Sequence, residues 1–173
     1  MTIRPINKND DTYVLPLIVS AFEETEFGYQ GEAELVKKIR QNITYNNELE
    51  LVYEIDKKIV GYGLLSTCWV KNDKQSFTGL ALAPLAVHKD YQRQGIGGKL
   101  MRELERTAIG LGYTFIVILG HPKYYSRFGY QPTSHYGVSS PFDVPEEFFM
   151  MKELQKDGLS QVMGTVYYSE AFN

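Results

Sequence analysis

The sequence predicts a mixed α/β fold, in which helices pack against a mixed sheet. Apolar residues recur at helical spacing in residues 10–42 and then alternate or cluster as they do in strands. In the middle of the chain a strand-like run, a glycine-rich turn, a helical pattern and a second apolar run follow one another. The 173 residues, 43% apolar and 23% charged, suit one globular domain, which we expect to span residues 1–173.

The first helix is expected over residues 10–24, after a short strand at residues 2–6. Asp10 or Asp11 is placed to cap this helix. Pro16 falls inside the pattern and predicts either a kink or a later start, because proline lacks the N–H that a helical hydrogen bond needs. The predicted apolar face consists of Val14, Leu15, Ile18 and Phe22.

A second helix is expected over residues 32–42, after a loop that reads FGYQG. Its predicted apolar face consists of Leu35, Val36 and Ile39.

Three strands are then expected, at residues 49–55, 57–70 and 76–88. The first two are joined by a tight turn at residues 56–58. Pro84 lies within the third strand and predicts an edge or a bulge, because proline cannot donate to a sheet ladder. A bulge there would splay this strand from its parallel neighbour and open a slot between the two.

A strand–helix–strand crossover completes the sheet. A helix is expected over residues 96–110, and the apolar run at residues 113–120 predicts a strand covered on both faces. The crossover predicts that the strands at 80–88 and 113–120 are parallel and that their connection is right-handed. Residues 162–169 predict a further strand, whereas FFMMKEL, residues 148–154, fits a strand or a helix equally well. The inward residues of the helix are expected to be Leu100, Met101, Leu104 and Ala108.

The turn YQRQGIGGKL begins that helix and carries three glycines within four positions. A dinucleotide fingerprint would need glycine at Leu100, and a P-loop would need serine or threonine there. What remains is Gln92-x-x-Gly95-x-Gly97. Free N–H groups at a helix start attract anions, and glycine lets a phosphate approach the backbone. The turn therefore predicts either a phosphate site or a tight turn that needs glycine for its shape alone.

Composition narrows the class of protein. The net charge of -3 implies no broad basic surface for nucleic acid, and no apolar stretch is long enough to span a membrane. Cys68 is the only cysteine, which excludes an internal disulfide and a cysteine-rich metal site; we expect it to be a small buried residue and expect no bound metal. The N-terminus lacks the apolar run of a signal peptide, so we expect a cytoplasmic protein.

These motifs together resemble the GNAT superfamily of acetyl-CoA-dependent N-acetyltransferases. LAPLAVHKDY followed by QRQGIGGKLMRELE resembles the acetyl-CoA signature of that superfamily, and YYSRFGYQP resembles its second, aromatic-rich signature. The order of elements also matches over most of the chain, and GHPKYYSRFGY with GTVYYSEAF is similar to the YhbS-like subgroup. The resemblance implies a GNAT fold: a mixed central sheet with a splayed parallel strand pair and helices on both faces.

The resemblance also implies where the coenzyme binds. Its pyrophosphate would bind the amides of the glycine turn, and its pantetheine tail would pair with the strand before that turn. The strand residues are Leu85, Ala86 and Val87, and the turn residues are Gln92, Arg93, Gln94, Gly95, Ile96, Gly97 and Gly98. Arg93 and Lys99 are also candidates to add charge near the phosphates, with an exposed surface position as the simpler interpretation for Lys99.

In the same family a tyrosine donates a proton to the departing CoA thiolate. Tyr125, four residues before Gly129, matches its spacing, and Tyr124 is the alternative. Many members carry an asparagine where this chain has His121, which would start a turn, contact the coenzyme or contact substrate. No general base stands out.

The implied activity is direct transfer of acetyl from acetyl-CoA to a primary amine of a small molecule or peptide. The alternatives are a non-catalytic CoA-binding regulatory module and a generic nucleotide-binding protein. The expected partners are the coenzyme and the amine, with no nucleic acid or membrane, and the chain would be a monomer or a homodimer. Glu23, Glu24 and Glu26 are candidate bases by location, and a chain of waters is the other option.

Overall fold

The structure is a computed structural model that describes residues 1–173. The chain divides into two compact units. The first contains Met1–Ser66 and Ala83–Thr107, and the second contains Thr67–Leu82 and Ala108–Ala171. Phe172 belongs to the first unit and Asn173 to the second.

The first unit contains β1, β2, most of β3 and the end of β4, and these strands follow the order β1-β2-β3-β4. β1 pairs with β2 and β2 with β3, both antiparallel. Asp56 and Lys57 form the β2–β3 turn with positive φ angles of 47° and 65°, as the predicted tight turn requires. The strands are β1 (Thr2–Pro5), β2 (Glu50–Ile55), β3 (Lys58–Lys71) and β4 (Ser76–Val87).

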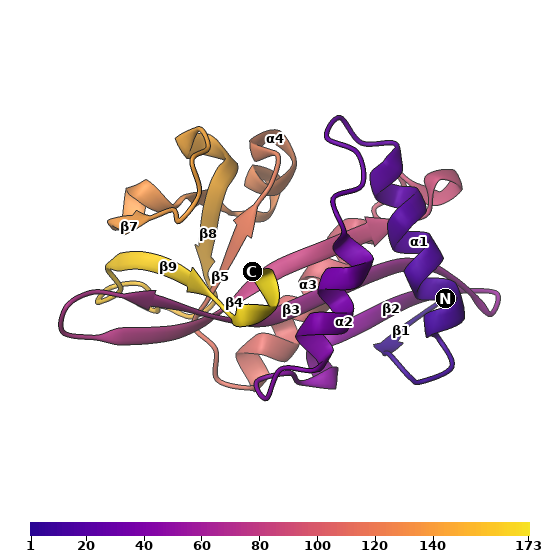
Figure 1. Ribbon diagram of the computed structural model, residues 1–173, viewed down its shortest axis with the longest axis horizontal. Helices are drawn as coiled ribbons and strands as arrows, with labels where there is room; N and C mark the ends of the chain where they lie inside the picture. Colours follow the sequence, from indigo (N-terminus) through magenta and orange to yellow (C-terminus); the bar gives the residue numbers. More distant parts are fainter. The chain divides into compact units, whose positions relative to one another are not determined.

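Helices cover both faces of the first unit's strands, as predicted. The three helices are α1 (Asp11–Glu23), α2 (Glu32–Arg40) and α3 (Ile96–Gly110). Figure 1 shows α1 and α2 in front of these strands and α3 behind them. A Cβ on Gly61 would lie 2.9 Å from Ile96 of α3, whereas the hydroxyl of Tyr62, on the opposite face, donates to Glu50, which binds Arg40 of α2. The two faces follow from the two-residue period of a strand.

Three details of the first helix differ from the sequence prediction. The helix begins at Asp11 and contains Pro16, so the later start is wrong. Asp10 stands at the cap position, but its carboxylate accepts hydrogen bonds from Arg4 at 2.7 Å and from the Asn7 N–H at 2.8 Å, and it makes no capping bond. Arg4 lowers the pKa of this carboxyl group. Leu17, rather than Leu15, is buried.

The second helix is also shorter than predicted and ends at Arg40. Its buried residues are Ala33, Val36 and Ile39, and Leu35 is only half-buried. In both helices the packing partners, which the sequence pattern leaves open, select the buried residues.

The second unit contains the parallel strand pair. β4 pairs with β5 (Phe115–Leu119) at Leu80↔Ile116 and Ala81↔Val117, which confirms the predicted crossover. The Ala83–Pro84 peptide is cis. The splay of the two strands beyond these positions stays a prediction.

FFMMKEL contributes a strand, and this settles the open alternative. β8 (Phe149–Glu153) runs antiparallel to β5 and also pairs with β6 (Gln131–Pro132). β9 (Gly164–Tyr168) lies antiparallel to β3 and parallel to β7 (Val138–Ser139). The short α4 (Pro122–Tyr125) follows β5. The remaining 3₁₀ turns are η1 (Asn47–Leu49), η2 (Lys89–Tyr91), η3 (Ser126–Phe128), η4 (Thr133–Tyr136), η5 (Glu146–Phe148) and η6 (Glu170–Phe172).

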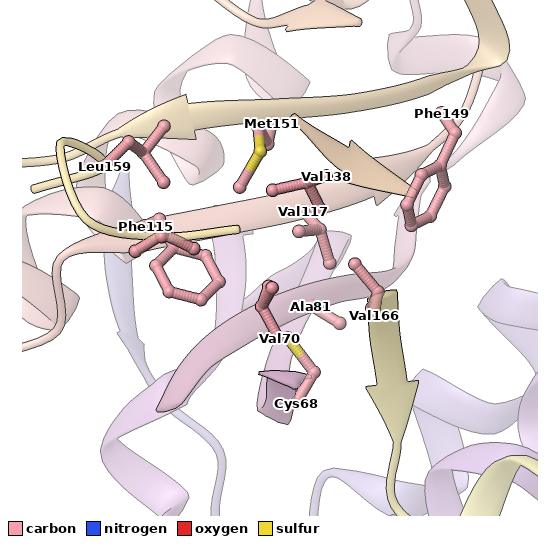
Figure 2. Packing of buried hydrophobic residues seen from close by; sticks show 11 residues of the cluster. Cys68, Val70, Ala81, Phe115, Val117, Val138, Phe149, Met151, Leu159 and Val166 are labelled. Carbon is pink, nitrogen blue, oxygen red and sulfur yellow. The ribbon is translucent and has the colours of Figure 1, made fainter. Parts of the chain in front are cut away.

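The core of the second unit is an apolar cluster, most of whose members Figure 2 labels. Cys68 is fully buried in it, and burial raises the pKa of its thiol, so its predicted role as a small buried residue is confirmed. The cluster consists of Cys68, Val70, Ala81, Phe115, Val117, Val138, Phe149, Met151, Leu159, Val162 and Val166.

None of the chain's helices combines the length and apolarity that crossing a membrane requires.

Candidate active site

The turn between β4 and α3 presents a run of free backbone donors. The first helical hydrogen bond of α3 runs from the Lys99 N–H to the Gly95 carbonyl, at 3.1 Å. The N–H groups of residues 93–98 have no acceptor in the protein. Orphan donors at a helix start carry a partial positive charge and suit an anion. The structure therefore brings together all seven predicted turn residues, Gln92–Gly98, at the start of α3.

The backbone of this turn is bent by two residues with positive φ. Arg93 has a φ of 61° and Gly95 a φ of 79°. A Cβ on Gly95 would meet no atom within 4 Å, so its left-handed backbone, and not lack of space, calls for glycine. Two glutamine side chains brace the turn: Gln92 donates to the Val87 carbonyl at 3.1 Å and Gln94 to the Asp90 carbonyl at 3.3 Å.

Only His88 and η2 separate the predicted pantetheine strand from the turn residues Gln92–Gly98. Leu85, Ala86 and Val87 are the last residues of β4 and belong, with the turn, to the first unit. Ala86 is buried, while Leu85 and Val87 are half-buried. His88 follows them and donates its N–H to the Val60 carbonyl at 2.8 Å. The structure therefore holds the strand and the turn as one continuous segment.

The predicted proton donor lies in the second unit, at the end of α4. The Tyr125 ring packs edge-on against Tyr124, with 4.9 Å between ring centroids, and its hydroxyl has no hydrogen-bond partner in the protein. Burial raises the pKa of this hydroxyl. A Cβ on Gly120 would lie 2.3 Å from the Tyr125 ring, so glycine at that position makes room for the ring. Because burial raises the pKa of its hydroxyl, Tyr125 keeps its proton at neutral pH.

Residues 16–130, more than half of the chain, match the Acetyltransferase (GNAT) family. The chain belongs to the GNAT family. Among curated proteins it is similar to two uncharacterized N-acetyltransferases of Escherichia coli strain K12. It is 32% identical to YhbS over 156 residues, which cover 90% of this chain and 91% of YhbS. It is 34% identical to YjhQ over 137 residues, which cover 76% of this chain and 75% of YjhQ.

Two solved GNAT structures are similar over nearly the whole chain. The Escherichia coli YhbS structure, in complex with CoA, matches with a TM-score of 0.88 and 31% identity, covering 99% of this chain and 91% of that one. A GNAT family acetyltransferase from Brucella melitensis, in complex with acetyl-CoA, matches with a TM-score of 0.79 and 27% identity, covering 99% and 97%. This GNAT chain has the predicted fold and is a GNAT-type N-acetyltransferase.

Other candidate residues of this GNAT protein have local structural roles. His121 precedes Pro122 at the start of α4, and its ring lies edge-on to Phe148 with 6.0 Å between centroids, which agrees with the predicted turn role. The Nζ of Lys99 is 5.9 Å from the centroid of the Tyr53 ring and 3.4 Å from its hydroxyl, so Lys99 is in contact with β2. Glu23, Glu24 and Glu26 are exposed, and Glu24 lies 3.9 Å from Lys89. No group of His, Cys, Asp or Glu side chains in this GNAT chain is arranged to hold a metal ion.

The sequence reasoning missed a buried polar cluster in the first unit. Glu50 is fully buried and accepts hydrogen bonds from Arg40 at 2.6 Å, Tyr45 at 2.5 Å and Tyr62 at 2.6 Å. Arg40 also reaches Asp11 at 2.8 Å, so α1, α2 and the sheet are joined. Burial is the main cause that raises the pKa of the Tyr62 hydroxyl, and the nearby carboxylate of Glu50 raises it further. The sequence signal that could have revealed this cluster is the acidic residue Glu50 within the mainly apolar strand LELVYEI.

Proposed function

We propose that this protein binds acetyl-CoA and transfers its acetyl group directly to a primary amine. The observation that carries the proposal is the run of N–H groups at residues 93–98, which face no protein acceptor at the start of α3. Such a run suits a pyrophosphate with few side-chain charges, and the net charge of the chain is -3. The CoA and acetyl-CoA complexes of the two similar GNAT structures support it.

Residues 85–87 would pair with the amide-bearing tail of the coenzyme in the manner of an added strand. An N–H of this strand would polarise the thioester carbonyl and stabilise the negative charge that develops on its oxygen. The Gln92 side chain already occupies the Val87 carbonyl, which keeps the end of the strand in place. The backbone thus binds and orients, and it supplies no proton.

Tyr125 supplies the proton in this proposal. The amine nitrogen bonds to the acetyl carbon, the carbon–sulfur bond breaks, and the sulfur takes the Tyr125 proton. Burial raises the pKa of the Tyr125 hydroxyl, so the group is protonated at neutral pH and has a proton to give. The amine gives up its own proton to a base, for which Glu23, Glu24, Glu26 and a chain of waters remain the candidates.

We also propose that residues 1–173 act as a single catalytic domain in the cytoplasm, as a monomer or a homodimer. The acceptor would be a small-molecule or peptide amine, and neither nucleic acid nor a membrane would take part. The net charge of -3 supports the exclusion of nucleic acid.

Calorimetric titration tests the coenzyme. Acetyl-CoA should bind more tightly than ATP or NAD, because only acetyl-CoA has a pantetheine tail for residues 85–87. Tighter binding of ATP or NAD would refute the proposal and favour a generic nucleotide-binding protein.

An amine panel tests the transfer step. Polyamines, aminoglycosides, amino acids and peptides are incubated with the protein and acetyl-CoA, and free CoA is measured. Release with at least one primary amine, together with its acetylated product in the mass spectrum, is expected. Tight acetyl-CoA binding with no release for any amine would instead support the non-catalytic regulatory module.

A further inference from the structure

We propose that the flank of α3 next to β1 and β2 binds a small molecule that carries a phosphate monoester on an apolar body. A cavity of about 370 Å³ lies there, within the first unit. This volume is within the range of small-molecule sites. None of the residues from 85 to 98 lines it, and Lys99, which directly follows Gly98, is the lining residue nearest to the pyrophosphate turn. The side chains that form it include Ile3, Tyr53, Lys99, Arg102, Glu103 and Arg106.

The charges in this cavity suit a dianion. Its three cationic side chains and one carboxylate leave a local side-chain charge of +2, in a chain whose net charge is -3. A phosphate monoester carries a charge of about -1.5 to -2 at neutral pH, whereas a single carboxylate carries only one negative charge. A monoester therefore matches the cavity better than a carboxylic acid does.

Of the three cationic side chains in the cavity, only Arg106 forms an ion pair within the protein. Arg102 is exposed and has no ion pair. The Nζ of Lys99 neighbours only neutral groups, the Tyr53 hydroxyl at 3.4 Å and the Met1 sulfur at 3.9 Å. Glu103 accepts from Arg106 at 2.7 Å, so its charge is engaged on the helix itself. Lys99 and Arg102 therefore supply the free positive charge.

The position of these residues also gives the ligand a shape. Residues 99, 102 and 106 lie on one side of α3, along about 10 Å of helix axis. Ile3, which is half-buried, and Met1, which is exposed, form an apolar wall beside them, and Tyr53 is almost fully buried at the base of the cavity. A ligand with an apolar body against Ile3 and Met1 and a phosphate toward Arg102 meets both surfaces.

Phenyl phosphate is a suitable probe, with phenol and benzenesulfonate as controls that lack the dianion. Calorimetry on the full chain should show phenyl phosphate binding at least about tenfold more tightly than either control. Arg102→Ala should weaken that binding by about tenfold or more. Lys8→Ala removes an exposed cation outside the cavity and should leave binding unchanged. Equal binding of probe and controls, or no effect of Arg102→Ala, would overturn the proposal.

A second arm separates a free phosphate ester from the 3′-phosphate of the coenzyme itself. Phenyl phosphate should bind equally well when the protein is saturated with CoA. Arg102→Ala should leave the affinities for CoA and for 3′-dephospho-CoA unchanged. If CoA displaces phenyl phosphate, or if Arg102→Ala weakens CoA alone, the cavity belongs to the coenzyme and the proposal fails. Arg102→Glu, checked by its thermal midpoint, repeats the test with the charge reversed.

Discussion

The start of α3 and the α4 turn differ in the kind of chemical group that each offers to the coenzyme in the proposed function. At the start of α3 the candidate groups are backbone N–H groups, and the nearby Gln92 and Gln94 side chains only brace carbonyls. At α4 the candidate group is one side-chain hydroxyl, that of Tyr125, which forms no hydrogen bond with another group of the protein. The first region should therefore respond to changes of backbone conformation and the second to the loss of a single oxygen.

The largest expected effect is at the side-chain region. Tyr125→Phe should lower kcat by roughly 100- to 1,000-fold, because it removes the proton donor, while the Kd for acetyl-CoA stays the same. Steady-state kinetics with an amine found in the panel and calorimetry measure the two quantities. Tyr124→Phe is the matched control and should retain kcat. If the two variants exchange these effects, Tyr124 is the donor.

At the backbone region, Gly95→Val should weaken acetyl-CoA binding by about tenfold or more, because a branched side chain disfavours the φ of 79° by at least about 1–2 kcal/mol. Calorimetry measures this change. Gln94→Ala, which keeps its N–H group, is the control and should bind nearly as the wild type does. Unchanged binding by Gly95→Val would show that the turn does not hold the pyrophosphate.

A substitution beside Tyr125 tests how closely that hydroxyl must be placed. Gly120→Ala would bring a Cβ to 2.3 Å from the ring, so the ring must move, and kcat should fall by about tenfold or more. In a Tyr125→Phe background the same substitution should have little further effect on kcat. Equal losses in both backgrounds would mean that Gly120 acts independently of Tyr125.

Alkaline pH tests the burial of Tyr125. The pKa of this group is raised in the folded chain, whereas in the unfolded chain it is about 10. Above about pH 10 the unfolded chain loses this proton and the folded chain keeps it, so the free energy of unfolding should fall by up to about 1.4 kcal/mol per pH unit. Urea unfolding at several pH values should show a shallower fall in Tyr125→Phe. Parallel curves would mean that the hydroxyl is well hydrated.

The smallest expected effect is again at the backbone region. Arg93→Gly should raise the free energy of unfolding by up to about 1 kcal/mol, because glycine adopts the φ of 61° without the penalty that arginine has there. Urea unfolding measures it. A loss of stability would show that the Arg93 side chain makes a contact that outweighs its backbone strain.

Local patterns predicted much of the fold and of the candidate site. The turn at Asp56 and Lys57, the helix at the glycine motif and the parallel crossover all follow from short-range rules, and the structure has each of them. Residues 92–98 could be found in the sequence because the glycines and the helix start lie within a few positions of each other.

Long-range contacts account for what the sequence did not predict. FFMMKEL forms a strand because β5 offers it a pairing edge from Phe115 to Leu119, far earlier in the chain. The Asp10 side chain makes no capping hydrogen bond because Arg4 offers it a charged partner.

By itself, the sequence determined most of the elements and their order, and it predicted the glycine turn as a candidate phosphate site. It did so because backbone periodicity, glycine and proline act within a few residues of themselves. Only the tertiary structure decided that Leu17 and Ala33 are buried in place of Leu15 and Leu35. It alone also decided that Glu50 is buried among Arg40, Tyr45 and Tyr62, and that Lys99 and Arg102 line a cavity with Tyr53. Those outcomes depend on which distant side chains share one surface, and the strand and helix packing sets that arrangement.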